Sequence, residues 1–102
     1  EVRNAFELGV FRGLFSAANA AAAHTILLQD LRSGRLVQTA VKWPLVFRIA
    51  SALSKRHSAT TGTRSMDILH VAAARSVWAV EFISFDSRQR LLATTVGLKV
   101  AP

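Results

Sequence analysis

The chain has 102 residues, of which 51% are apolar, and it contains no cysteine. This composition predicts one globular domain over residues 1–102, and it excludes a disordered chain, a disulfide framework and a thiolate metal site. It is compatible with a cytoplasmic protein, which is the location we expect. No apolar run reaches the roughly 18 residues of a membrane span, so no membrane association is expected.

Positive charge dominates the sequence, with 13 Lys and Arg against 6 Asp and Glu and a net charge of +7. Residues 36–66 carry cations and no acid. Such a basic surface favours a polyanionic partner such as RNA. A surface that only keeps the protein soluble explains the same charge.

The first part of the chain has a helical pattern. Apolar residues spaced by three and four predict a first helix within residues 2–13. Ser16 is suited to cap a second helix over residues 17–32, which Gly34 ends. Residues 36–41 are apolar and β-branched, and they predict a short edge strand or extended segment.

The middle of the chain predicts two further helices. Pro44 fits the first turn of a third helix that ends near His57. The polar residues 58–65 predict a loop. Ser65 is placed to cap a fourth helix, and Asp67 then lies in its first turn, where the helix dipole favours a negative charge.

The last part of the chain predicts a strand, a helix and a strand. Residues 80–85 are almost uniformly apolar, as in a buried strand of a parallel sheet. Asp86 or Ser87 begins a fifth helix, Gly97 ends it, and residues 98–101 form the final strand. A strand–helix–strand run of this length predicts a parallel crossover.

Two aspartates are expected to meet at one end of this sheet. A helix over residues 67–78 extends about 18 Å. The strand from Val80 to Asp86 returns by about 20 Å. Because the two lengths match, Asp86 comes back to the level of Asp67, at the carboxyl end of the strands, where ligands bind in open α/β sheets.

Several motifs in this region resemble the C-terminal half of a PIN domain, as found in VapC-type toxins. They are the helix "MDILHVAAA", the strand end "SFD", the basic helix that follows it and "GLKV". The opening "EVRNAF" resembles the helix that carries another acidic residue of the family, here Glu1. The resemblance implies an α/β fold, a three-layer α/β/α domain with a central parallel sheet. Its first strand, helix and second strand have no counterpart here, so the domain is expected to be incomplete at its N-terminus.

The resemblance also implies an activity, that of a metal-dependent endoribonuclease acting as the toxin of a toxin–antitoxin system. Glu1, Asp67 and Asp86 would be the catalytic residues and would hold Mg²⁺ or Mn²⁺. The family's first aspartate has no counterpart, so activity is expected to be impaired. RNA and an antitoxin protein would be the partners.

Other residues are candidates for supporting roles. Ser84 and His70 are placed to support the metal ligands, and Arg64, Arg88 and Arg90 are placed to contact RNA. Each also has a purely structural interpretation: the aspartates as helix-capping acids, the histidine as a packed side chain, and the arginines as solvated charges.

A second function is compatible with the same sequence, namely a catalytically inactive PIN remnant that acts as a protein interaction module. A sheet without its leading strands exposes a strand edge and an apolar face. We therefore expect a homodimer or a higher oligomer.

Overall fold

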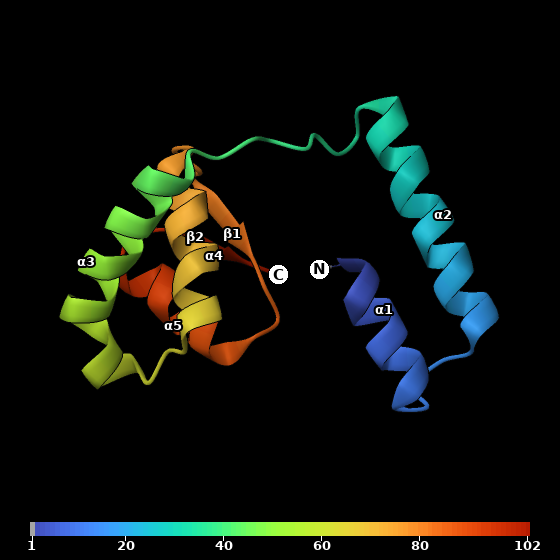
Figure 1. Ribbon diagram of the computed structural model, residues 1–102, viewed down its shortest axis with the longest axis horizontal. Helices are drawn as coiled ribbons and strands as arrows, with labels where there is room; N and C mark the ends of the chain where they lie inside the picture. The colour runs from blue at the N-terminus through green and yellow to red at the C-terminus, as the bar shows by residue number, and fades with distance from the viewer. Residues whose placement is uncertain (1) are drawn as a thin grey trace. The chain divides into compact units, whose positions relative to one another are not determined.

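The computed structural model describes residues 2–102; Glu1, and with it the metal-binding role expected of it, lies outside the described residues. These residues form five helices and two short strands (Figure 1). They divide into two compact units, Glu1–Thr39 and Ala40–Pro102. No helix of residues 2–102 combines the length and the apolar character needed to cross a bilayer.

The expected three-layer α/β/α fold with a central parallel sheet is wrong. Residues 2–102 are mostly helical, and their only sheet has two parallel strands. Residues 36–41, expected as an edge strand or an extended segment, have no ladder partner and form an irregular connection between two helices. Apolar and β-branched composition favours an extended backbone, but a strand also needs a neighbour to pair with, and this segment has none among the described residues.

The first unit is a pair of helices, α1 (Val2–Phe11) and α2 (Ala17–Ser33), which pack on each other. Gly9 is the buried residue of α1, and a Cβ atom at this position would overlap the ring of Phe15. The glycine therefore lets the loop after α1 fold back closely on the helix.

The ends of α2 were predicted correctly. The Ser16 hydroxyl accepts a hydrogen bond from the backbone N–H of Asn19 at 3.1 Å, which satisfies one of the free N–H groups of the first turn. Gly34 ends the helix with a φ of 79°, in the left-handed region that favours glycine.

The second unit begins with α3 (Trp43–Thr61) and α4 (Ser65–Ser76), which lie side by side. Proline in the first turn of α3 agrees with the prediction, but the helix continues through residues 58–61, which were expected as a loop. It ends at Gly62, again in the left-handed region. Ser65, expected as the cap of α4, is instead its first residue.

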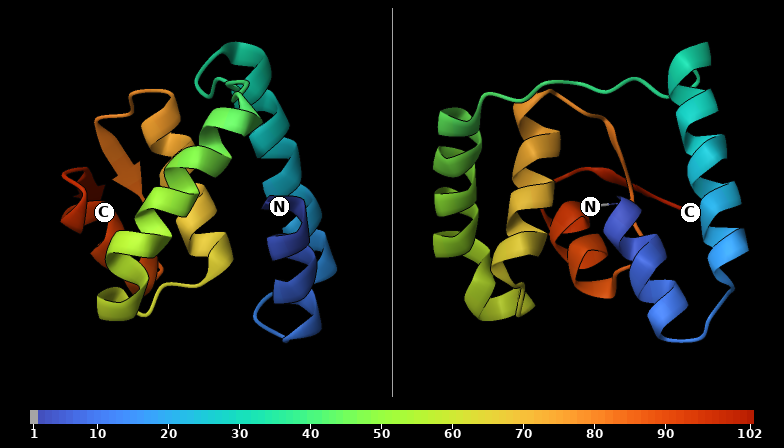
Figure 2. Two further views of the ribbon diagram at one scale, coloured as in Figure 1. Left: turned by 60° about the vertical axis from the view of Figure 1, so that its left-hand side comes forward. Right: turned by 45° about the vertical axis from the view of Figure 1, so that its right-hand side comes forward.

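The core of the second unit lies between α3, α4 and α5 (Ser87–Thr95). Each helix contributes one of the three largest fully buried side chains: Val46, Val71 and Leu92. Burial of such a side chain stabilises the fold by roughly 1.5–3 kcal/mol. Helices α3, α4 and α5 all contact one another, and the ribbon can be followed in Figure 2.

The sheet is covered on one face within the second unit. Strand β1 (Glu81–Ile83) pairs with β2 (Lys99–Ala101), so that Phe82 lies beside Val100. Both pack against the core, whereas Ile83 points to the other face and is 72% exposed. The expectation of a strand buried on both faces is therefore wrong for this unit.

Candidate functional site

The candidate site is built at the start of α4, around a buried carboxylate. Asp67 is 7% exposed, and it is the one buried charged side chain among residues 2–102. Its Oδ2 accepts a hydrogen bond from the backbone N–H of Arg64 at 3.0 Å. Its Oδ1 accepts one from the side-chain amide of Gln89 at 3.2 Å, and this bond joins α4 to α5. Both oxygens of the buried carboxylate are thus satisfied.

The second carboxylate is the N-cap of α5. Asp86 Oδ1 accepts hydrogen bonds from the backbone N–H groups of Arg88 at 2.9 Å and of Gln89 at 3.1 Å. The bond from Gln89 is the main cause that lowers the pKa of Asp86 below the ordinary value. Desolvation opposes this shift, and the positive charges of Arg88 and Arg64 add to it. Asp86 is therefore a stable anion at neutral pH.

Gln89 connects the two aspartates. Its side-chain amide donates to Asp67 and its backbone N–H donates to Asp86. Its Oε1 accepts a hydrogen bond from the Ser84 hydroxyl at 2.9 Å, and this hydroxyl accepts the backbone N–H of Asp86 at 3.1 Å. The structure therefore brings Asp67, Asp86 and Ser84 together in one network, named here the Gln89 network, where α4 and α5 begin.

Sequence reasoning missed Gln89, although a signal for it exists. Gln89 stands three residues after the capping Asp86, the position at which Glu or Gln completes a capping box. In such a box the side chain turns back to its own N-cap. Here it turns to Asp67 on the neighbouring helix, so it serves tertiary structure rather than its own helix end.

The remaining candidate residues divide by their contacts. His70 Nδ1 lies 2.7 Å from the carbonyl oxygen of Met66, one turn earlier in α4. Arg90 Nη1 donates to the carbonyl oxygens of Ser84 at 2.9 Å and of Pro102 at 3.0 Å, and so it ties together the ends of the two strands. These hydrogen bonds give Arg90 a structural role that does not require RNA. Arg64 and Arg88 are exposed on the side of Asp86.

The donor chemistry of the network fits a hard divalent cation such as Mg²⁺ or Mn²⁺. Carboxylate, amide and hydroxyl oxygens are suitable ligands, and Mg²⁺ needs only one or two protein carboxylates because it keeps several waters. Within residues 2–102, the hydrogen bonds to Asp86 reach Oδ1 and leave Oδ2 available. No group of three or more His, Cys, Asp or Glu side chains comes together within residues 2–102, so the candidate set in this part of the chain is a pair.

Comparison of the chain with protein-family models, with curated proteins and with solved structures gave no match. The Gln89 network and the surface around it are therefore the features that indicate a function.

Proposed function

We propose that the Ala40–Pro102 unit carries a PIN-type ribonuclease site, in which Asp67 and Asp86 bind Mg²⁺ or Mn²⁺ and RNA is the substrate. The observation that supports this proposal is the Gln89 network, because one residue donates to both acids, through its side-chain amide to Asp67 and through its backbone N–H to Asp86. A purely capping role of each aspartate would not require that link. The resemblance to PIN domains points to the same two residues.

Each member of the network has a role in this proposal. When bound, the metal ion would supply an activated water and stabilise negative charge on phosphorus. Asp86 would bind it through Oδ2, and Asp67 through the remaining lone pairs of its carboxylate. Gln89 and Ser84 would fix the orientation of both carboxylates.

The substrate would be held by the exposed cations beside the site. Arg64 and Arg88 lie close enough to Asp86 to lower its pKa, and a phosphate bound between them would lie next to the metal. We further propose that this activity operates in the cytoplasm as a toxin, restrained by an antitoxin protein. Exposed apolar side chains such as Phe11 and Phe47, at 86% and 57%, would suit a protein partner of this kind.

The decisive experiment compares aspartate-to-asparagine variants of the full chain. Cleavage of a fluorescent single-stranded RNA is measured with Mn²⁺ and with EDTA. Asp67→Asn and Asp86→Asn should each reduce the Mn²⁺-dependent rate at least about tenfold, and the double variant should lose little more, because both residues act on one ion. The matched control is Glu81→Gln, an exposed acid of the same unit outside the network, which should keep the parental rate. Cleavage that survives both substitutions would refute the assignment.

Metal affinity gives a second, independent measurement. With two carboxylates already engaged in hydrogen bonds, we expect weak binding, with a Kd of about 1 mM for Mn²⁺. Titration calorimetry should show this binding for the parent chain and for Glu81→Gln, and should not detect it for Asp86→Asn. Micromolar binding that Asp86→Asn leaves unchanged would place the metal elsewhere.

We also propose self-association through the uncovered face of the sheet. Ile83 and Phe85, at 72% and 87% exposure, present apolar side chains beside the edge of β1 that has no strand partner among residues 2–102. Parallel sheets are normally covered on both faces, and a second copy would supply that cover. Light scattering should give a dimer mass that Ile83→Lys converts to a monomer. A parent chain that remains monomeric at high concentration would contradict this.

An inactive PIN remnant that serves as an interaction module is the second candidate function. It is favoured by the hydrogen bonds that both carboxylate oxygens of Asp67 accept, because a structural role explains them without a metal. In that case the RNA assay would show no metal-dependent cleavage by the parent chain. The apolar surfaces of the unit would then carry the function.

A further inference from the structure

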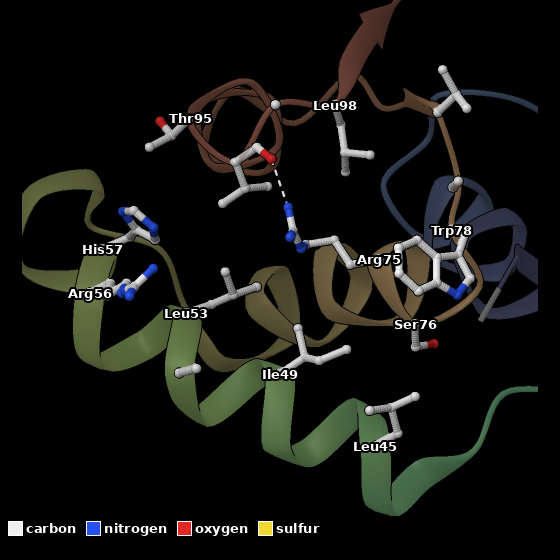
Figure 3. A pocket seen from close by; sticks show the side chains of 15 residues that line it. Leu45, Ile49, Leu53, Arg56, His57, Arg75, Ser76, Trp78, Thr95 and Leu98 are labelled. Atoms are coloured by element: carbon white, nitrogen blue, oxygen red, sulfur yellow. Dashed lines mark hydrogen bonds between the residues drawn. The ribbon is translucent and has the colours of Figure 1, made fainter.

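A groove of about 1050 Å³ opens at the end of the second unit that lies away from the Gln89 network. Helices α4 and α5 begin at the network and end at the groove, and α3 forms its other wall (Figure 3). Its lining is largely aliphatic and aromatic, with Leu45, Ile49, Leu53, Trp78, Val80 and Leu98.

The charged residues of the groove are both basic: Arg56 and Arg75 line it together with His57, and no acidic residue does. Figure 3 shows the guanidinium of Arg75 pointing across the groove. Arg75 Nη1 donates a hydrogen bond to the carbonyl oxygen of Val96 at 2.7 Å. His57 and Arg56 lie together toward the end of α3, so polar, basic side chains lie beside the apolar ones.

Trp78 adds an exposed aromatic ring to the wall of this groove. Its side chain is 90% exposed, and its φ of 58° lies in the left-handed region that a bulky residue rarely adopts. A large ring presented beside an aliphatic groove is the kind of residue that carries much of the free energy of protein binding.

We propose that this groove binds an amphipathic helix of a partner protein, with apolar residues on one face and acidic residues beside them. The aliphatic lining would accept the apolar face, and Arg56, His57 and Arg75 would meet the carboxylates. A second copy of the chain fits this groove poorly, because no helix of residues 2–102 carries more than one acidic residue to meet these cations. RNA also fits poorly, because most of the lining offers neither a cation nor a hydrogen-bond donor to phosphates.

The test uses a synthetic fluorescent peptide with leucines at positions i, i+3, i+4 and i+7 and glutamates between them, titrated with the full chain. Fluorescence anisotropy should show saturable binding. A scrambled peptide of the same composition, and a peptide with lysine in place of glutamate, should each bind at least about tenfold more weakly. Equal binding of the scrambled peptide would overturn the proposal, because it would show attraction to charge without a groove.

Neighbouring substitutions on α3 separate the groove from general charge. Arg56→Glu should weaken binding about tenfold, a change of roughly 1.4 kcal/mol. Lys55→Glu makes the same charge change at an adjacent exposed residue outside the groove and should change affinity less than about threefold. Equal effects of the two variants would refute the site.

The apolar contribution is tested by Trp78→Ala, which removes an exposed ring and leaves the core intact. Peptide affinity should fall about tenfold, while circular dichroism and the urea midpoint remain close to those of the parent. If Trp78→Ala binds the peptide with the parental affinity, the peptide-binding proposal is wrong. It is also wrong if single-stranded RNA displaces the peptide from the parent chain and Arg56→Glu weakens RNA binding, because the groove would then be an RNA site. These readouts are independent of RNA cleavage, so a failure here leaves the nuclease proposal to its own tests.

Discussion

At the two ends of the Ala40–Pro102 unit, the side chains that bond the helix termini have opposite charges, for the same physical reason. Helices α4 and α5 both begin at the Gln89 network, where Asp67 and Asp86 accept hydrogen bonds from backbone N–H groups. Both end at the groove, where Arg75 donates to the carbonyl oxygen of Val96. The partial charges at helix ends favour acids at the first end and cations at the second.

This comparison shows that charge at a helix end is explained by stability alone and does not identify a functional site. Two other features need a further explanation. At the first end, the Gln89 side chain donates to Asp67 of α4, while its backbone N–H donates to Asp86 at the start of α5. At the second end, aliphatic side chains and an exposed tryptophan line an open groove. The following predictions test how far the two ends depend on each other and on capping.

The largest effect is expected from the core that supports both ends. Leu92 is fully buried between α3, α4 and β2, and Leu92→Ala should lower the free energy of unfolding by about 3 kcal/mol. Urea denaturation followed by circular dichroism measures this. Leu91→Ala is the matched control on the same helix; because Leu91 is 50% exposed, its cost should be below about 1 kcal/mol. Equal losses would show that the core lies elsewhere.

The next effect concerns the buried acid. Asp67→Ala removes two hydrogen bonds to a carboxylate and leaves the Gln89 amide without its partner, so unfolding should become easier by about 2 kcal/mol. The Asp67→Ala and Gln89→Ala losses should not add, because both variants remove the same bond. Strict additivity in the double variant would show that the connection between the two helices is weak.

At the groove, Arg75→Ala should lower the free energy of unfolding by about 1 kcal/mol, because it removes the hydrogen bond to Val96 and a positive charge at the end of α4. Arg75→Lys should recover part of this loss. Arg48→Ala, which removes an exposed cation within α3, should change stability by less than about 0.5 kcal/mol. If Arg48→Ala lowered the free energy of unfolding as much as Arg75→Ala, the position of Arg75 at the helix end would make no contribution to stability.

The smallest effect is a pH dependence at Asp86. Because the folded pKa of this carboxyl is lowered, its charge adds stability above the unfolded pKa, and that stability is lost as the pH falls through the folded pKa. Asparagine caps a helix about as well as aspartate, so Asp86→Asn should be less stable than the parent at pH 7 and equal to it at acidic pH. Thermal melts across this range measure the difference. A gap that stays constant with pH would contradict the lowered pKa.

The helices could be predicted from sequence because local rules determine their ends. Ser16, Gly34 and Asp86 end or cap helices in the structure as expected. The sheet could not be predicted in this way. Residues 36–41 and 80–85 have the composition of strands, but pairing and cover depend on distant residues, and only Glu81–Ile83 of these two segments joins a ladder within the described chain.

The candidate site was predictable only in part. The matched lengths of helix and strand predicted that Asp67 and Asp86 come to the same end of the unit, and in the structure Gln89 contacts both. The role of Gln89 depends on the angle between α4 and α5, which no spacing in the sequence expresses. The groove was missed because its walls come from three helices, and the way in which these helices pack is not expressed by any spacing in the sequence.

The backbone at Trp78 has a consequence for engineering the protein. A left-handed φ at a residue other than glycine stores about 1 kcal/mol of conformational strain. Glycine would release that strain, and the core would lose no contact because the indole is 90% exposed. A selection for thermal tolerance alone should therefore replace this tryptophan readily, whereas a selection that also requires partner binding should keep it. The identity of residue 78 in the selected variants would thus show whether selection acts on thermal stability alone or also on partner binding.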